Sequence, residues 1–359
     1  MAKMQAVQLE ELRKPMEYKQ VDIPVIGDED VLVRVTASGI CRTDWHVWNG
    51  DWTWAGLELP TPIVLGHEIG GIVERVGADV TDLKPGMRVC VPFNFADGDC
   101  PYCRRGLQNL CQNASWNFTT PGSGGFAQYA RVPNAHLNCL PLPDNVTEKD
   151  GAALGCRYMT AYRAVRSRAQ VQAGETVVIV GIGGVGRSAV QIAAAMSALV
   201  IAVDHKPSAL EAAKQLGAGH VVNSDVLSPK EVGESIKKLT GSKGADVAID
   251  AVGGSNATLS ALSGLAKGGR LCIAGLTTQD DKGQVSIPID QLVLSEFSLV
   301  GTLGNPHSAY TELLQLVDTG KLQPGKLIRE EVALKDVQGV FDRMPTFDTE
   351  GFVIITDFN

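Results

Sequence analysis

A glycine-rich turn between a buried strand and a helix is the feature that most constrains the fold of this chain. Thr176 to Val180 form an apolar run typical of a strand buried on both faces, and the chain continues as Gly181-Ile182-Gly183-Gly184-Val185-Gly186. A helical stretch follows from Arg187 to Met196. Gly181 permits a tight turn, Gly183 lets the backbone approach a pyrophosphate, and Gly186 lets helix and strand pack closely. The turn therefore predicts a dinucleotide site at a helix N-terminus, where the partial positive charge favours phosphate.

An acidic residue stands where such a site binds the adenosine ribose. The strand Leu199 to Val203 ends in Asp204, 18 residues after Gly186. A carboxylate at this distance accepts hydrogen bonds from the ribose hydroxyls and repels a 2′-phosphate, so the cofactor is predicted to be NAD. His205 and Lys206 follow directly and could contact a phosphate, so we expect the preference over NADP to be incomplete.

The rest of the chain divides by pattern. Short β-like runs such as Val31 to Val35 and Ile69 to Val76, broken by glycine and proline, indicate a mostly antiparallel domain over the first 150 residues. From about Thr160, strands and helices alternate, which indicates parallel βαβ units. Strand signals near Leu299-Val300 and Val353 to Ile355 suggest that the C-terminus completes the first domain.

Two cysteines and a histidine offer zinc an open site. The segment Gly66-His67-Glu68 follows Cys41 by 26 residues, and Cys156 lies far downstream. Cys41, His67 and Cys156 would give two thiolates and one imidazole. Three protein ligands leave a position for water or substrate, which distinguishes a catalytic zinc from a structural one.

A second group of ligands lies on a polar loop. Asp97, Cys100, Cys103 and Cys111 fall within fifteen residues, among glycines and a proline. This spacing predicts a closed, tetrahedral, four-ligand zinc site. Metal ligation is favoured over disulfides in a chain of this length. The other three cysteines, Cys90, Cys139 and Cys272, are expected to be small buried hydrophobic residues.

Composition excludes several classes of protein. The chain has 359 residues, 44% hydrophobic and 20% charged, which suits two globular domains. A net charge of −8 argues against binding nucleic acid as a main role, because nucleic-acid binders usually carry a basic face. The start lacks an apolar signal core, and the apolar run Ala189 to Val203 is too short for a membrane span. We therefore expect a cytoplasmic enzyme with no membrane partner.

Taken in order, these motifs resemble the zinc-containing medium-chain alcohol dehydrogenases over essentially the whole chain. The segments that carry the resemblance are Cys41 to His46, Gly66 to Glu68, the cysteine loop, Gly124 to Tyr129, Leu154 to Cys156 and Gly181 to Gly186. The resemblance implies an α/β protein with two domains. A GroES-like, mostly antiparallel β catalytic domain would span residues 1–157 and be completed by 296–359. A Rossmann domain with a doubly wound parallel sheet would span 158–295 and bind NAD.

The resemblance also implies roles for individual residues. Cys41, His67 and Cys156 would bind catalytic zinc, and Glu68 would be a nearby carboxylate that exchanges onto the metal. Asp44 would orient the His67 imidazole. Thr43 would accept the proton of the substrate hydroxyl and pass it through the cofactor ribose to His46. Arg42 would reach the pyrophosphate, and the cofactor contacts would include Gly181, Gly183, Gly184, Val185, Gly186, Asp204, His205, Gly275 and Leu276.

Three features depart from the family pattern or narrow the subgroup. Asp97 replaces the first of four structural cysteines, and its oxygen would hold zinc more weakly than a thiolate. Phe352 stands where many relatives place an arginine against the pyrophosphate. The short connection between Cys111 and Phe126 is similar to that of tetrameric microbial members, so we expect a homotetramer.

The sequence does not identify the substrate beyond a small alcohol, aldehyde or ketone. Five aromatic residues could line an apolar pocket, but core positions are equally compatible with them: Trp48, Trp52, Trp54, Phe93 and Trp116. A polyol or sugar dehydrogenase with the same zinc chemistry is an alternative, and would need more hydrogen-bonding side chains near the metal. A non-catalytic nucleotide-binding protein on the same fold is a further alternative, disfavoured because all three ligands of the catalytic site are present.

Overall fold

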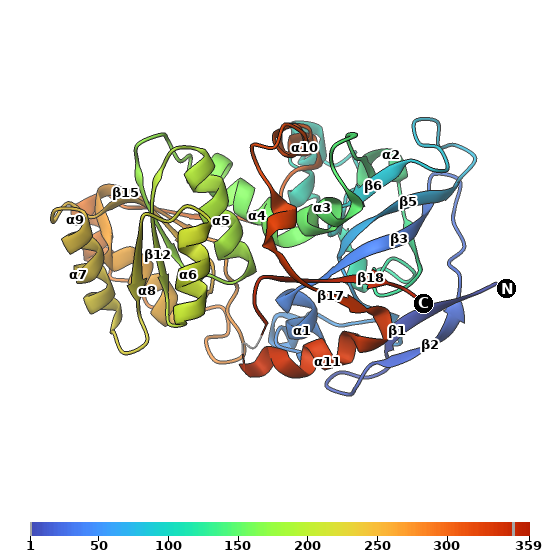
Figure 1. Cartoon of the computed structure of the whole chain (residues 1–359), viewed down its shortest axis with the longest axis horizontal. Coiled ribbons are helices and arrows are strands. Elements are labelled where there is room, and N and C mark those ends of the chain that lie inside the picture. Colours follow the sequence, from blue (N-terminus) through green and yellow to red (C-terminus); the bar gives the residue numbers. More distant parts are fainter. Residues whose placement is uncertain (1, 347–348) are drawn as a thin grey trace. The chain divides into compact units, whose positions relative to one another are not determined.

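The chain folds into two compact units. The computed structural model describes residues 2–346 and 349–359. One unit contains the chain up to Met159 together with Gly304–Asn359, and the other contains Thr160–Leu303 (Figure 1). No helix in this described part is long and apolar enough to cross a membrane.

The first unit is built on a seven-stranded sheet, in the order β10-β6-β5-β3-β18-β17 with β9 also paired to β3. Only β17 and β18 pair in parallel. The strands are β3 (Val31–Ile40), β5 (Glu68–Val76), β6 (Arg88–Val91), β9 (Tyr129–Val132), β10 (Leu140–Pro141), β17 (Ile328–Ala333) and β18 (Phe352–Asp357). The mostly antiparallel pattern predicted for this part of the chain is confirmed.

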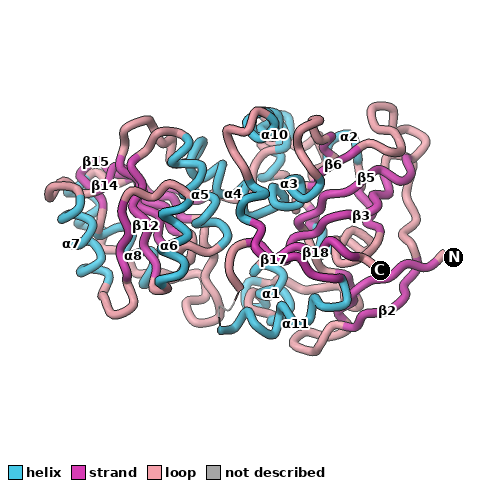
Figure 2. Tube along the Cα trace, in the orientation of Figure 1, coloured by secondary structure: helices cyan, strands magenta, loops and turns pink. Residues whose placement is uncertain are grey.

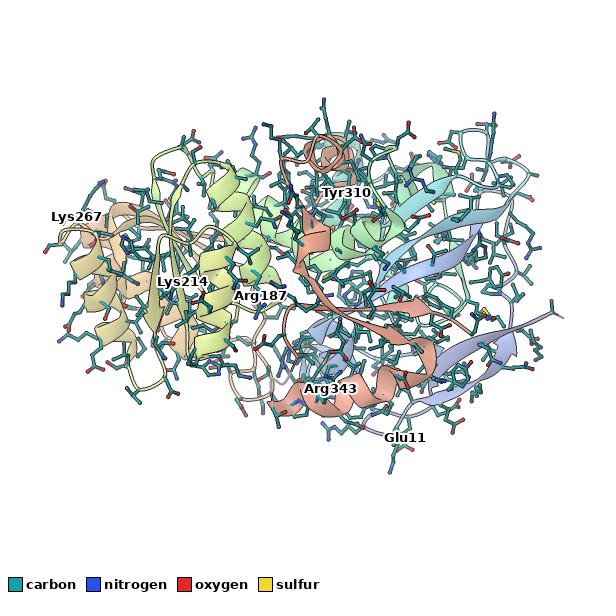
Figure 3. All side chains as sticks on the ribbon, viewed as in Figure 1. Glu11, Arg187, Lys214, Lys267, Tyr310 and Arg343 are labelled. Atoms are coloured by element: carbon teal, nitrogen blue, oxygen red, sulfur yellow. The ribbon has the colours of Figure 1, made fainter. Side chains whose placement is uncertain are left out.

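Among the described residues, the first unit also contains two smaller sheets and five α-helices. The smaller sheets contain β1 (Lys3–Leu9), β2 (Glu17–Asp22) and β4 (Ile63–Val64), and then β7 (Asn94–Phe95) and β8 (Ser115–Trp116). The helices are α1 (Arg42–Asn49), α2 (Ala135–Asn138), α3 (Glu148–Ala153), α10 (Tyr310–Asp318) and α11 (Val337–Arg343). Tyr310, labelled in Figure 3, is fully buried at the start of α10, where its hydroxyl donates to Met159 Sδ.

Apolar side chains from segments far apart in the sequence form the core of this unit. Val33 on β3, Ile69 on β5 and Val353 on β18 are all buried in it, together with Phe126 and Phe341. The rings of Phe126 and Phe341 meet edge to face, with centroids 6.2 Å apart. The burial of these side chains fixes the strands that carry the candidate site.

The second unit is a doubly wound α/β fold. Its six parallel strands follow the order β13-β12-β11-β14-β15-β16. They are β11 (Thr176–Val180), β12 (Leu199–Asp204), β13 (His220–Asn223), β14 (Ala245–Asp250), β15 (Leu265–Ile273) and β16 (Ser298–Gly301). The helices are α5 (Gly184–Ala195), α6 (Pro207–Gln215), α7 (Pro229–Leu239), α8 (Ser255–Ser263) and α9 (Ile289–Ser295) (Figure 2). A short helix, α4 (Met159–Tyr162), joins the two units in sequence.

The strand order reverses between β11 and β14, and this position matters for function. Right-handed crossovers put α5 and α6 on one face of the sheet and α7 and α8 on the other. Ligands of such sheets bind beyond the carboxyl ends of the strands at the reversal. Gly181 follows β11 directly, so the glycine-rich turn lies at this position.

Two local expectations need correction. The helix after the glycine turn begins at Gly184 rather than Arg187, because glycines 184 and 186 form its first turn. The strand at Leu299 and Val300 does not return to the first unit. It is β16, which pairs in parallel with β15 at the edge of the second sheet.

Candidate active site

The first metal ligand is also the cap of a helix. Cys41 is the N-cap of α1, with extended backbone at φ −98° and ψ 152°, and its Sγ accepts from the backbone N–H of Thr43 at 3.4 Å. The Asp44 carboxylate accepts in return from the N–H of Cys41 at 3.0 Å. This reciprocal capping box lies between β3 and α1 and holds the Cys41 sulfur at the N-terminus of the helix.

Asp44 then fixes the second ligand. Its Oδ1 lies 2.8 Å from His67 Nδ1 and accepts from the N–H of Gly66 at 3.0 Å. Asp44 and His67 are both fully buried. A carboxylate on Nδ1 makes this nitrogen the protonated one and leaves Nε2 with a lone pair for a metal.

Four ligand groups converge at this point. One ligand atom from each of Cys41, His67, Glu68 and Cys156 lies within 4.8 Å of the others. Cys156 reaches the group from a π-helical turn over Leu154–Tyr158, a type of turn that is frequent at functional sites. His67 Nε2 is buried and has no hydrogen-bond partner. A buried polar atom without a partner is costly, and a zinc ion held by sulfur and nitrogen would satisfy it.

Glu68 is held by an arginine that sequence reasoning missed. Its Oε1 accepts from Arg157 Nε at 2.9 Å and from the Arg157 backbone N–H at 3.1 Å, while Oε2 accepts from Nη2. The guanidinium carbon lies 3.8 Å from the centroid of the Phe352 ring. Arg157 directly follows Cys156, a predicted metal ligand, and this position in the sequence could have indicated that Arg157 lies near the site.

Burial and the neighbouring charges shift the pKa of each titratable group in this cluster. A hydrogen bond from the Cys156 thiol, together with His67, lowers the pKa of Cys41, while the Cys41 thiolate raises the pKa of Cys156. Burial opposes the charged form of His67, but the Asp44 carboxylate and Cys41 raise its pKa overall. Burial raises the pKa of Glu68, and the Arg157 guanidinium opposes this shift. The cluster therefore already favours one thiolate before metal binds.

The second group forms a compact lobe. Ligand atoms of Asp97, Cys100, Cys103 and Cys111 also lie within 4.8 Å of one another. The three thiols are buried, and Cys111 Sγ accepts from the backbone N–H of Asp97 at 3.4 Å. The four residues thus form a compact set of side chains that could hold a metal ion.

Asp97 is anchored in this lobe by hydrogen bonds. Its Oδ1 accepts from the N–H groups of Asp99 at 2.9 Å and Cys100 at 3.1 Å, and its Oδ2 accepts from Asn113 Nδ2 at 2.6 Å. The Cys100 N–H and the Asn113 amide lower the pKa of Asp97 well below its usual range. Burial raises the pKa of Cys103 and of Cys111. The hydrogen bonds to Asp97 thus favour its ionised form.

Thr43 and His46 lie three positions apart on α1, and therefore on one face of the helix. Both are half-buried. His46 Nδ1 lies 2.5 Å from Oδ2 of the buried Asp51, a partner not foreseen from the sequence. Burial lowers the pKa of His46, although the hydrogen bond to Asp51 opposes this. His46 is thus a neutral base near pH 7.

Some of the aromatic residues lie beside the His67 ring, and others pack elsewhere in the first unit. Phe93 and Phe118 lie edge-on to the His67 ring, at centroid distances of 6.3 and 5.6 Å. Trp48 packs on Phe341 and donates to Lys14, which is a structural role. Trp54 is 40% exposed. Trp52 lies 5.3 Å from the His46 ring, and Trp116 packs on Phe118.

The glycine turn of the second unit has the geometry its sequence predicts. Gly181 has φ 86°, a conformation that favours glycine. A side chain on Gly186 would lie 1.8 Å from the carbonyl oxygen of Gly181, whereas one at Gly183 would meet nothing within 4 Å. The turn is therefore tight at its base and open above Gly183. Gly184 and Val185 form the first turn of α5, with N–H groups that need an external acceptor.

Asp204 ends β12 beside this turn. Its Oδ2 accepts from the N–H of Ile182 at 2.7 Å, and its Oδ1 from the N–H of Lys206 at 2.9 Å. His205 Nδ1 lies 3.4 Å from Asp204 Oδ1. The carboxylate thus has a fixed position at the carboxyl end of the strand.

The remaining predicted cofactor residues lie in separate units. A side chain on Gly275 would lie 2.0 Å from the backbone nitrogen of Gly253, so only glycine fits there. Leu276 is 63% exposed. In the first unit, Arg42 donates to the carbonyl of Met344 at 2.9 Å and its guanidinium lies 5.1 Å from the Trp45 ring. Burial lowers the pKa of Arg42.

Two further polar residues escaped sequence reasoning. Asn305 and His307 are 0% and 4% exposed. Neither side chain forms a hydrogen bond of normal geometry, although the Asn94 backbone is close enough to affect the pKa of His307. Burial lowers the pKa of His307 to about 4. They follow Gly304, where a side chain would lie 2.8 Å from the Phe93 ring. No motif marked them, because a single Asn or His carries no pattern.

Comparison with known proteins agrees with this geometry. A family model described as alcohol dehydrogenase GroES-like domain matches residues 27–144, and one described as zinc-binding dehydrogenase matches 184–319. An alcohol dehydrogenase of Geobacillus stearothermophilus is 36% identical, over 98% of this chain and 99% of the relative. The chain belongs to the zinc-containing medium-chain alcohol dehydrogenase family.

Further members show the same full-length match. A protein of Saccharolobus solfataricus named NAD-dependent alcohol dehydrogenase is 34% identical, covering 97% of this chain and 98% of that relative. The structure of the alcohol dehydrogenase TADH from Thermus sp. ATN1 has a TM-score of 0.89 at 29% identity, over 99% of this chain and 100% of that chain. Both family domains, GroES-like and Rossmann, are thus present in this member.

Proposed function

We propose that this protein is a zinc-dependent alcohol dehydrogenase that interconverts alcohols with aldehydes or ketones, using NAD. The observation that carries the proposal is the buried His67 Nε2, which lacks a hydrogen-bond partner and lies among the ligand atoms of Cys41, Glu68 and Cys156. Full-length relatives named alcohol dehydrogenase support the activity.

The chain's own residues prepare this chemistry. Zinc, when bound, lowers the pKa of an alcohol hydroxyl and polarises a carbonyl, while NAD accepts or returns a hydride. Cys41, His67 and Cys156 would hold the metal with one position open for the substrate oxygen. Asp44 fixes the ring of His67, so that Nε2 keeps its direction during turnover.

The proton would leave through α1. In this proposal, Thr43 accepts the proton of the substrate hydroxyl and His46 receives it, and the position of both residues on one face of α1 supports this relay. Neutral His46 can accept that proton, and Asp51 then stabilises the imidazolium that forms. Phe93 and Phe118, beside His67, would exclude water from the reacting carbon.

The nucleotide would bind at the reversal of strand order in the second unit. The free N–H groups at the start of α5 would meet the pyrophosphate, and the gap above Gly183 lets it approach. Asp204 would accept from the adenosine ribose and disfavour NADP, with His205 and Lys206 weakening the preference. Gly275 and Leu276 follow β15 at the same edge of the sheet. The family resemblance assigns Arg42 to the pyrophosphate.

A polyol substrate is the second candidate, and one observation favours it. Asn305 and His307 are buried with unpaired side chains, next to a glycine that touches the Phe93 ring. With its lowered pKa, His307 is neutral near pH 7 and offers one donor and one acceptor, and Asn305 offers an NH2 donor group and a carbonyl acceptor. These groups would suit the second hydroxyl of a diol better than a charged group.

Assembly and compartment are part of the proposal. The short connection between Cys111 and Phe126 supports a homotetramer of the kind found among microbial relatives. All eight cysteines are free, which suits a reducing compartment such as the cytoplasm. Sedimentation of the purified protein and fractionation of cells test these two statements.

The activity test is direct. Purified protein would be assayed for NADH formation with primary, secondary, cyclic and aromatic alcohols and with vicinal diols, alongside zinc analysis. We expect turnover of several alcohols and two zinc ions per chain. No turnover of any alcohol by the zinc-loaded protein would overturn the assignment. A kcat/KM that favours diols over matched mono-alcohols would select the polyol candidate.

A further inference from the structure

Arg157 and Glu68 form a buried ion pair directly beside the proposed metal. Glu68 is fully buried, and the Arg157 side chain is 8% exposed. Three N–H groups of Arg157 serve the carboxylate: Nε and the backbone on one oxygen, and Nη2 on the other. A two-pronged pairing of this kind fixes the orientation of a carboxylate as well as neutralising its charge.

The backbone packs closely around this ion pair, and two glycines face Glu68. Gly39 lies opposite Glu68 in the register between β3 and β5, and a side chain there would lie 2.1 Å from Glu68 Oε2. A side chain on Gly155 would lie 2.6 Å from the Glu68 Cα. On the far side, the Phe352 ring lies against the guanidinium at 3.8 Å. Phe352 thus provides a flat support on which a planar cation stacks well.

Without this pairing, Glu68 would compete for the metal. Its carboxylate lies within 4.8 Å of the ligand atoms of Cys41, His67 and Cys156, and a carboxylate oxygen is a normal zinc ligand. Four protein ligands would close the site in the manner of a structural zinc. The charge balance also favours the pairing of Arg157 with Glu68. Two thiolates, the Glu68 carboxylate and a divalent ion together carry one net negative charge, which Arg157 neutralises.

We propose that Arg157 is a positioning residue that clamps Glu68 off the catalytic zinc and so keeps the fourth coordination position open. The inference rests on the proposed zinc site, and it deepens that function by assigning what maintains the open position. Phe352 supports the clamp, because its ring lies against the Arg157 guanidinium.

The test uses cobalt-loaded full-length protein and imidazole as the probe of the open position. In the parent protein, imidazole should bind and shift the visible cobalt spectrum. In Arg157→Met, Glu68 should occupy the position, so the spectrum without imidazole changes, imidazole no longer binds, and kcat/KM falls about a hundredfold. In Arg157→Met with Glu68→Gln, imidazole binding should return. Difference spectra against the parent cancel the contribution of the cysteine lobe.

Controls separate the clamp from general damage and from the proposed function itself. Arg270 pairs with Glu175 through Nη2, at 2.8 and 2.7 Å from its two oxygens, in the second unit, so Arg270→Met should leave the cobalt spectrum unchanged. If Arg157→Met does not fold, Arg157→Lys is the alternative variant. It keeps the positive charge but loses the paired N–H groups of the guanidinium, so it should bind imidazole more weakly than the parent.

The outcomes are distinct. Imidazole binding of parental affinity in Arg157→Met would overturn the clamp, and so would loss of binding that Glu68→Gln fails to restore. Absence of cobalt at the Cys41 and His67 site in the parent protein would instead remove the proposed function.

Discussion

The two groups of potential metal ligands in the first unit contain similar side chains but are assembled from different parts of the chain. The cluster of Cys41, His67 and Cys156 draws on a helix cap, a strand start and a π-helical turn that are far apart in sequence. The lobe of Asp97, Cys100, Cys103 and Cys111 takes all its ligands from one short loop. The first cluster depends on the whole fold of its unit, whereas the lobe holds its own geometry. The group proposed to keep an open coordination position is thus the one whose ligands are positioned by the fold of the whole unit and not by a single loop.

Removing a ligand of the first cluster should have the largest effect. Cys41→Ala or His67→Ala should lower kcat by at least about a thousandfold, because an electrophilic site of this kind contributes several kcal/mol to the barrier. NAD affinity should stay within a few-fold, since the glycine turn shares no residue with the metal site. Steady-state kinetics and calorimetric titration with NAD check both statements. Near-parental turnover by either zinc-free variant would refute the role of this cluster.

Removing the lobe metal should instead affect stability before chemistry. A chelator should take this zinc first, because the oxygen of Asp97 is a weaker partner than sulfur for a borderline-soft ion. Asp97→Ala should lower the melting temperature by several degrees while leaving kcat within a few-fold. Zinc analysis and thermal unfolding measure this, with Asp99→Ala as the neighbouring control. One zinc per chain in fully active protein, with Asp97→Ala as stable as the parent, would mean that the lobe binds no metal.

The buried His307 should make the stability of the protein depend on pH. The His307 pKa of about 4 lies below the ordinary value near 6.5, so the unfolded chain binds this proton first. The contribution of His307 is fully present above pH 6.5 and is lost as the pH falls toward 4, by about 3 kcal/mol at most. Between pH 7 and 4, the unfolding free energy of the parent should fall more steeply than that of His307→Gln. Parallel curves would show that His307 is not buried in neutral form.

Cofactor choice should show the smallest of these effects. Asp204→Ala should reduce the preference of kcat/KM for NAD over NADP by roughly tenfold, because one charge repulsion with the 2′-phosphate is lost. The Asp204 carboxylate also accepts from the N–H of Ile182 in the glycine-rich turn. Because the substitution removes this hydrogen bond, binding of NAD itself should weaken slightly. A parent protein that already prefers NADP would show that His205 and Lys206 outweigh the carboxylate.

Pattern alone predicted the parts of the molecule in which one short segment carries the whole signal. The glycine turn and the cysteine lobe are of this kind, since the strand, turn and helix, or the ligand spacing, can be read directly. The Arg157–Glu68 pair could not be found in this way, because the two residues are 89 positions apart and meet only when a π-helical turn packs beside β5. Asn305 and His307 were missed for a related reason. Their significance lies in burial without partners, which no single position reveals.

The capping of α1 by Cys41 has a consequence for metal loading. The sulfur that would hold zinc is the same atom that accepts from the N–H of Thr43. Electron density withdrawn by a cation weakens that acceptor, while the same cation ties the cap residue to His67 and Cys156. Ion uptake and order in the first turn of α1 are therefore linked, and each must bias the other by an equal free energy. The exchange rates of the Thr43 and Asp44 amide hydrogens would then report site occupancy from the backbone alone, with no substrate present.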